Sequence, residues 1–181
     1  MTHKLAAGKA FPAITLPMLG GGQADIATPS QGHDWKLIVV YRGKHCPLCN
    51  KYLTQLEQLR DGFSKIGVDV IAVSTDSQTR ATDQISEVGA TYPAGYGLTL
   101  EQAGMLGLYI SGVRNGMDVE APFAEPGLFV VNEQGNLQLV DISNVPFARP
   151  DLQAVLSGLT WLRSQSVKFP VNGTHEPGKT Q

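Results

Sequence analysis

Two short apolar runs predict buried strands in the first half of the chain. Residues 35–41 and 68–74 consist largely of apolar and β-branched side chains, the pattern of strands covered on both faces of a sheet. Between them, apolar residues recur at helical spacing from Leu48 to Ile66, and Gly67 ends the pattern. This order predicts a βαβ unit with parallel strands.

The second half of the chain predicts a β-hairpin followed by a helix. Residues 128–131 and 137–140 are strand-like and flank a glycine-containing loop. Pro150 and Asp151 then begin a helix, with Pro150 suited to its first turn and apolar residues at Leu152, Val155, Leu156, Leu159 and Leu162. Two shorter helices are expected at about 77–88 and from Thr99 to about Tyr109.

An edge hairpin is expected at the N-terminus, because residues 11–26 alternate around Gly20, Gly21 and Gly22. The complete order predicts an α/β fold. We expect a thioredoxin-like three-layer sandwich, with a central mixed sheet, helices on both faces and an N-terminal β extension. Residues 1–165 are expected to form a single domain, and residues 166–181, rich in Pro, Gly and polar side chains, a flexible tail.

Charge and hydropathy argue against several functional classes. Of the 181 residues, 17% are charged, and 14 basic residues face 16 acidic ones, so no broad field attracts nucleic acid or an anionic membrane. The longest apolar stretch, residues 37–41, is far short of the ~18 residues of a membrane span. We expect no nucleic acid or membrane partner and, since no signal-peptide core is visible, a cytoplasmic protein.

The two cysteines of the chain form a CxxC motif at the predicted start of a helix. Cys46, Pro47, Leu48 and Cys49 follow a strand, and free N–H groups and the positive helix dipole favour a thiolate there. We therefore expect Cys46 to be the nucleophile and Cys49, one turn into the helix, to resolve it as a redox-active disulfide. Pro47 suits the first helical turn, since it has no N–H to satisfy.

Positive residues directly precede the motif. Arg42, Lys44 and His45 are expected to lower the pKa of Cys46 below its free value of about 8.5. A solvated surface role is an equally good interpretation of Arg42 and Lys44, and His45 fits an ordinary loop residue equally well.

Two other interpretations of the cysteines remain open. A structural zinc site would need further ligands, yet there is no second cysteine pair and His3, His33, His45 and His175 lack zinc-finger spacing. Both cysteines would also fit as inert core residues. No cofactor is expected, because no nucleotide-binding or P-loop glycine motif is apparent.

Residues 40–49, VYRGKHCPLC, followed by an amphipathic helix, resemble the AhpC/TSA peroxiredoxin-like branch of the thioredoxin superfamily that carries CPxC. The resemblance covers about residues 10–163. It implies a thioredoxin fold with a thiol that reduces peroxides or disulfides.

The chain departs from this family's pattern at three places. The resemblance would place a proline at Val39, a threonine or serine at Gly43, and an arginine just before Leu128. The missing hydroxyl removes one donor to the peroxide oxygens. Two substitutes are candidates, Arg42 and Arg149, each able to polarise a peroxide or lower the thiol pKa. A structural or exposed role is at least as good an interpretation of both.

Pro126 stands where thioredoxin-like disulfide reductases carry a cis proline facing the CxxC motif. The resemblance then implies that the backbone beside Pro126 pairs with a substrate strand. A plain proline that starts a strand is the alternative.

These observations predict a thiol-dependent antioxidant oxidoreductase. Cys46 attacks a peroxide or a disulfide, Cys49 resolves the product, and a thioredoxin-type partner or a small thiol reduces the Cys46–Cys49 bond. The family favours a peroxide, whereas Gly43 and Pro126 favour a disulfide. A protein-disulfide reductase and a non-enzymatic redox sensor or binding module are the alternatives, and the resemblance allows for a homodimer.

Overall fold

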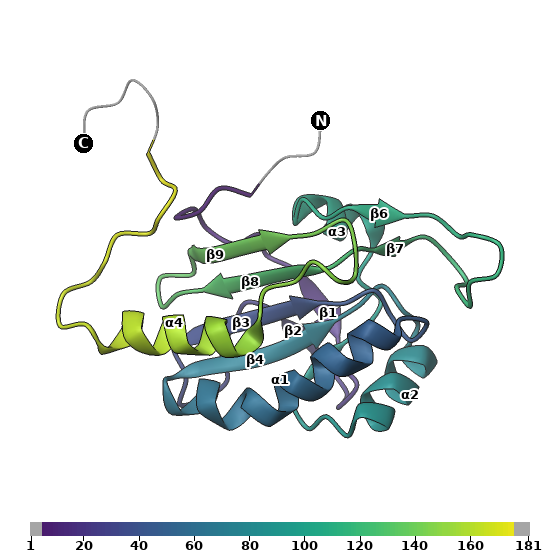
Figure 1. Cartoon of the computed structure of the whole chain (residues 1–181), viewed down its shortest axis with the longest axis horizontal. Helices are drawn as coiled ribbons and strands as arrows, with labels where there is room; N and C mark the ends of the chain where they lie inside the picture. Colours follow the sequence, from purple (N-terminus) through teal and green to yellow (C-terminus); the bar gives the residue numbers. More distant parts are fainter. Residues whose placement is uncertain (1–4, 176–181) are drawn as a thin grey trace.

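The computed structural model describes residues 5–175 and contains a five-stranded mixed sheet (Figure 1). The strand order is β5-β4-β3-β8-β9; β3 runs parallel to β4, and β4 to β5, while β8 is antiparallel to both β3 and β9. The strands are β3 (Trp35–Val40), β4 (Val68–Val73), β5 (Ala94–Gly95), β8 (Gly127–Val131) and β9 (Leu137–Ile142). The predicted order of parallel strands first and an antiparallel hairpin last is confirmed.

Alternate residues of the central strand β3 feed two separate cores. Leu37 and Val39 pack into the cluster beneath α1 (Pro47–Lys65) and α4 (Leu152–Ser164), which lie along one face of the sheet (Figure 1). Ile38 and Val40 point to the other face. The continuous apolar run of β3 therefore reflects burial on both faces, as predicted.

The second face is covered by short elements. The N-terminal hairpin consists of β1 (Thr15–Pro17) and β2 (Gln23–Asp25), and the small helix α3 (Leu100–Met105) lies beside it. The remaining helix, α2 (Gln78–Val88), packs next to α1. The thioredoxin-like sandwich with an N-terminal β extension is confirmed.

Two local expectations are corrected, and one further element is found. The helix expected from Thr99 to Tyr109 ends at Met105, because Gly107 adopts a positive φ of 69°. Asp151 is the N-cap of α4 and accepts the Ala154 N–H, so Pro150 precedes the helix instead of standing in its first turn. A two-stranded ribbon, β6 (Ile110–Ser111) with β7 (Phe123–Ala124), was not predicted.

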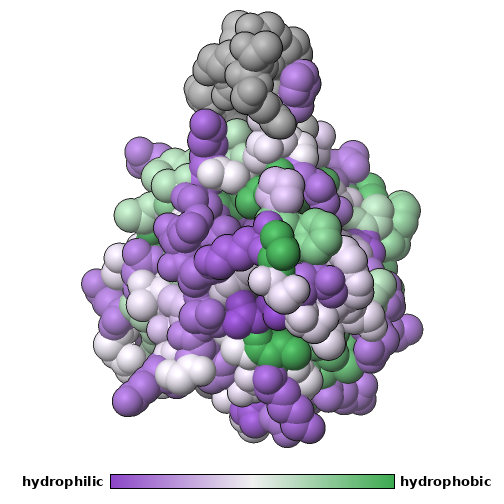
Figure 2. Space-filling model, turned by 90° about the vertical axis from the view of Figure 1, so that its left-hand side faces the viewer, coloured by the Kyte–Doolittle hydropathy of each residue, from purple (hydrophilic) through white to green (hydrophobic). Residues whose placement is uncertain are grey.

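The segment after α4 contains no helix or strand in its described part, and the end of the predicted tail, 176–181, lies outside the described residues. Lys168 forms an ion pair with Glu133, and Phe169 stacks on Trp161. This end of the molecule shows hydrophobic residues in separate groups among hydrophilic ones (Figure 2). In the part of the chain described, no helix is long and apolar enough to cross a bilayer.

Candidate active site

Cys46 is the N-cap residue of α1, at the end of the sheet where β3 and β4 finish. Its Sγ accepts the backbone N–H of Cys49 at 3.3 Å, as a capping side chain does at a helix start. Both cysteines are unpaired thiols, and Cys46 is only 2% exposed. The CxxC motif is thus placed at the helix N-terminus as predicted.

The environment of Cys46 favours its thiolate. Its pKa is lowered to about 6, chiefly because the Cys49 side chain donates a hydrogen bond to it. Burial opposes this shift, while the Cys49 backbone N–H, the charge of Arg149 and a hydrogen bond from Arg42 add to it. Cys46 is then mostly ionised at pH 7.

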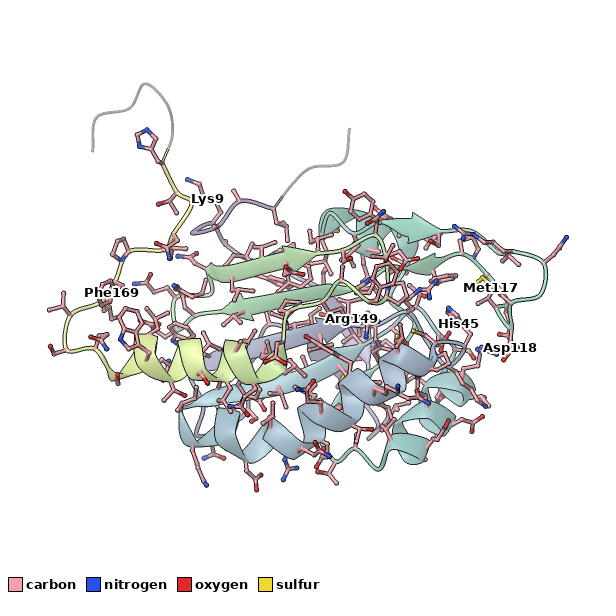
Figure 3. All side chains as sticks on the ribbon, in the orientation of Figure 1. Lys9, His45, Met117, Asp118, Arg149 and Phe169 are labelled. Atoms are coloured by element: carbon pink, nitrogen blue, oxygen red, sulfur yellow. The ribbon has the colours of Figure 1, made fainter. Side chains whose placement is uncertain are left out.

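Cys49 is fully buried, and burial raises its pKa. Its Sγ nevertheless accepts a hydrogen bond of 2.8 Å from Nη2 of Arg149, which belongs to the segment between β9 and α4. The Arg149 guanidinium lies 5.1 Å from the centre of the Tyr52 ring. The structure therefore brings Arg149, labelled in Figure 3, to the site as expected, but its guanidinium contacts the second cysteine.

Arg42 also lies at the site, held by the β6–β7 ribbon. Its Nε is 3.1 Å from Oε2 of Glu125, and its guanidinium lies 4.9 Å from the centre of the Phe123 ring. Glu125 is 3% exposed and accepts the Ser111 hydroxyl at 2.5 Å. A buried carboxylate therefore fixes the arginine that hydrogen-bonds Cys46.

The place of the family's missing hydroxyl is occupied by a carboxylate. Gly43 has φ = 126°, and a Cβ built on it would lie 2.6 Å from both carboxylate oxygens of Asp76. Asp76 accepts the Lys44 backbone N–H at 2.8 Å and lies 3.6 Å from Arg80 Nε. Glycine is therefore required here, and Asp76 fixes the loop that leads to Cys46.

Two of the expected thiol-activating residues do not act as predicted. Lys44 forms an ion pair with Asp83 of α2, with Nζ and Oδ2 2.6 Å apart, and the positive charges that lower the Cys46 pKa come from Arg149 and Arg42. His45 packs against Phe123 with ring centres 4.5 Å apart and ring planes tilted by 59°. Burial, reinforced by Arg42 and Arg80, lowers its pKa to about 4, so His45 is neutral at pH 7 and supplies no positive charge.

The interpretation of Pro126 as a cis proline is wrong. No peptide bond among residues 5–175 is cis. The carbonyl of Pro126 accepts the Ser143 N–H at 3.0 Å, and the Glu125 N–H donates to the backbone carbonyl of Tyr109 at 2.8 Å. Since these backbone groups are already paired within the protein, they are not free to bind a substrate strand. Pro126 precedes β8, as the alternative interpretation stated.

Four residues at the site were given no role by the sequence. Asp76 follows the end of β4, and side chains at the carboxyl ends of neighbouring parallel strands meet, so its position was a usable signal. Glu125, Phe123 and Tyr52 carried none, because the ribbon was not predicted and Tyr52 fitted the apolar face of α1. In the described part of the chain, no three His, Cys, Asp or Glu side chains cluster as metal ligands.

Comparison with known proteins gives a family and a fold. The sequence model of the AhpC/TSA family matches residues 7–140. A search of curated proteins found no match.

Solved structures of peroxiredoxins share the fold at low sequence identity. Peroxiredoxin 6 of Arenicola marina is 19% identical with a TM-score of 0.71, covering 97% of this chain and 81% of its own. Peroxidoxin BcpB of Mycobacterium tuberculosis is 17% identical with a TM-score of 0.70, covering 88% and 99%. PrxQ of Xylella fastidiosa is 15% identical with a TM-score of 0.67, covering 88% and 98%.

Proposed function

Since the chain belongs to the AhpC/TSA family and is a peroxiredoxin-like thiol oxidoreductase, we propose that Cys46 is its peroxide-reducing thiolate and Cys49 its resolving thiol. The observation that carries this assignment is the hydrogen bonding at the start of α1. The Cys46 sulfur accepts the Cys49 N–H at 3.3 Å, and its pKa is lowered to about 6. Cys46 is therefore charged at pH 7, while burial keeps Cys49 protonated.

The reaction would proceed in three steps. The Cys46 thiolate attacks one peroxide oxygen, the O–O bond breaks, and the other oxygen leaves and takes a proton, so that Cys46 becomes a sulfenic acid. The Cys49 sulfur then attacks Cys46, forming the disulfide and releasing water. Finally, a dithiol or two small thiols return two electrons by thiol–disulfide exchange.

A small peroxide fits the site better than a protein disulfide. Cys46 is 2% exposed, so a small oxidant needs less opening of the surrounding loop than a folded partner does. The Glu125 N–H and the Pro126 carbonyl, two of the backbone groups that would pair with a substrate strand, are already hydrogen-bonded within the protein. Arg42 lies on the Cys46 side of the site, where it would stabilise the charge that develops on the leaving oxygen.

We also propose a reductant and a cellular compartment. A thioredoxin-type protein or a small thiol would reduce the Cys46–Cys49 disulfide, and the reaction would take place in the cytoplasm. A homodimer is compatible with the family. Comparing the rates with a thioredoxin and with a monothiol at equal thiolate concentration identifies which reductant is used.

The test is the second-order rate at which hydrogen peroxide consumes the Cys46 thiol, compared with free cysteine at equal thiolate concentration. We expect a rate far above that reference, none for Cys46→Ser, and an accumulated sulfenic acid for Cys49→Ser. A rate equal to free cysteine would contradict a peroxidase. It would favour the disulfide reductase or redox sensor instead.

A further inference from the structure

Arg149 is fixed against Cys49 by contacts on both sides of its guanidinium. Nη2 donates to Cys49 Sγ at 2.8 Å, and Nη1 donates to the Leu48 carbonyl at 3.4 Å. The face of the guanidinium covers the Tyr52 ring, and the Tyr52 hydroxyl donates to the Pro150 carbonyl at 2.8 Å. These contacts join α1 to the segment before α4 and direct the arginine at one sulfur.

We propose that Arg149 is a catalytic residue of the disulfide chemistry, stabilising negative charge on the Cys49 sulfur when the disulfide forms and when it is reduced. This proposal rests on the proposed function of the same thiol pair. It adds a role on Cys49 to Arg149, whose charge also helps to lower the Cys46 pKa, whereas Arg42 serves Cys46.

The negative charge of the Cys46–Cys49 thiol pair has to move to Cys49 during the reaction cycle. In the reduced protein Cys46 is the thiolate, and Cys49 donates a hydrogen bond to it. Once Cys46 is a sulfenic acid or part of a mixed disulfide, it no longer carries that charge. Cys49 must then become the thiolate although it is fully buried, and a buried anion needs a charged partner within direct reach.

Cys49 carries the charge in two steps. In resolution, Cys49 loses its proton and attacks Cys46 Sγ; the S–S bond forms, the S–O bond breaks, and the hydroxyl leaves as water with that proton. In reduction, a thiolate of the dithiol reductant attacks Cys46 Sγ, the Cys46–Cys49 bond breaks, and Cys49 leaves as a thiolate. The second thiol of the reductant then displaces Cys46, completing a two-electron transfer.

The test separates reduction from oxidation. The Cys46–Cys49 disulfide is formed beforehand with oxidised glutathione, and its reduction by dithiothreitol at pH 7 is followed by acid quenching, alkylation and mass spectrometry. We expect Arg149→Met to slow reduction about threefold to tenfold, because a leaving thiol with a higher pKa departs more slowly. The rate of thiol loss to hydrogen peroxide, corrected for the fraction of Cys46 thiolate, should change less.

Arg163→Met is the matched control. Arg163 also lies over an aromatic ring, 4.8 Å from the centre of Trp35, but it stands at the other end of α4. We expect this variant to be reduced at the wild-type rate. Arg149→Lys keeps the charge and should recover part of the rate, and Arg149→Gln repeats the comparison if the methionine variant does not fold.

Equal reduction rates for the wild-type protein and the uncharged Arg149 variants would overturn the proposal, as would an equal slowing of the peroxide step. A wild-type peroxide rate no higher than that of free cysteine would instead contradict the proposed peroxidase function. The reduction experiment would still decide the role of Arg149, since it starts from a disulfide made without peroxide.

Discussion

Buried Glu125 and partly buried Arg42 form an ion pair beside Cys46, with Oε2 and Nε 3.1 Å apart. Glu125 stands just before β8, where the family resemblance leads one to expect an arginine. In this chain the arginine comes instead from the loop after β3, and the residue before β8 holds it in place. A positive charge beside Cys46 is thus supplied by Arg42 in this chain.

The Arg42–Glu125 ion pair predicts that the stability of the fold and the rate with peroxide can be changed separately. Arg42→Met leaves the Glu125 carboxylate buried without its charged partner, so we expect a loss of about 3–5 kcal/mol in the free energy of unfolding. Adding Glu125→Gln removes the buried charge and should restore most of that stability, while the peroxide rate stays low. Urea unfolding and peroxide kinetics on both variants test this, and recovery of the rate in the double variant would contradict a catalytic Arg42.

The low pKa of Cys46 predicts the pH dependence of its reactivity. Because the thiolate is the nucleophile, the rate should be half-maximal near pH 6 and nearly constant above about pH 7. Cys49→Ala removes the side-chain hydrogen bond that contributes most to the shift, so its half-maximum should move to higher pH. Alkylation by iodoacetamide across pH 4–10 measures both midpoints. Identical midpoints would show that Cys49 does not tune Cys46.

Gly43 predicts that the family's hydroxyl cannot simply be restored. A side chain there meets the Asp76 carboxylate at 2.6 Å and adopts a positive φ, so Gly43→Thr should destabilise the fold by more than the ~1–2 kcal/mol of backbone strain alone. Gly89→Ala is the control, since Gly89 also has a positive φ but nothing within 4 Å of its Cβ position. Equal losses of unfolding free energy in the two variants would show that contact with Asp76 is unimportant.

The parts of the fold that could be predicted are those encoded by local periodicity. The apolar runs of β3 and β4, the helical spacing after Cys46 and the hairpin after Pro126 each carried their own signal. The β6–β7 ribbon has only two residues in each strand, too few to show alternation.

The candidate site, like the fold, contains residues that the local sequence predicts and residues that it does not. Cys46 and Cys49 are three positions apart at a predicted helix start, so their arrangement followed from the local sequence. Asp76 could have been found from its place after β4, whereas Glu125 reaches the site through a tertiary contact from a distant element, which one sequence does not reveal. His45 was misjudged because proximity in sequence suggested a charge that burial against Phe123 removes.

His45 makes the protein sensitive to acid. Its pKa is lowered to about 4 in the folded protein, against about 6.5 in the unfolded chain, so between these values the unfolded chain binds more protons. The free energy of unfolding contributed by this group is therefore constant above about pH 6.5 and falls as the pH drops toward 4. His45→Phe keeps a ring against Phe123 but cannot bind a proton, and should lose less stability over this range than the wild-type protein does. Urea unfolding at pH 7, 5.5 and 4.5 provides the comparison. Equal losses of unfolding free energy in the two proteins would contradict a lowered His45 pKa in the folded protein.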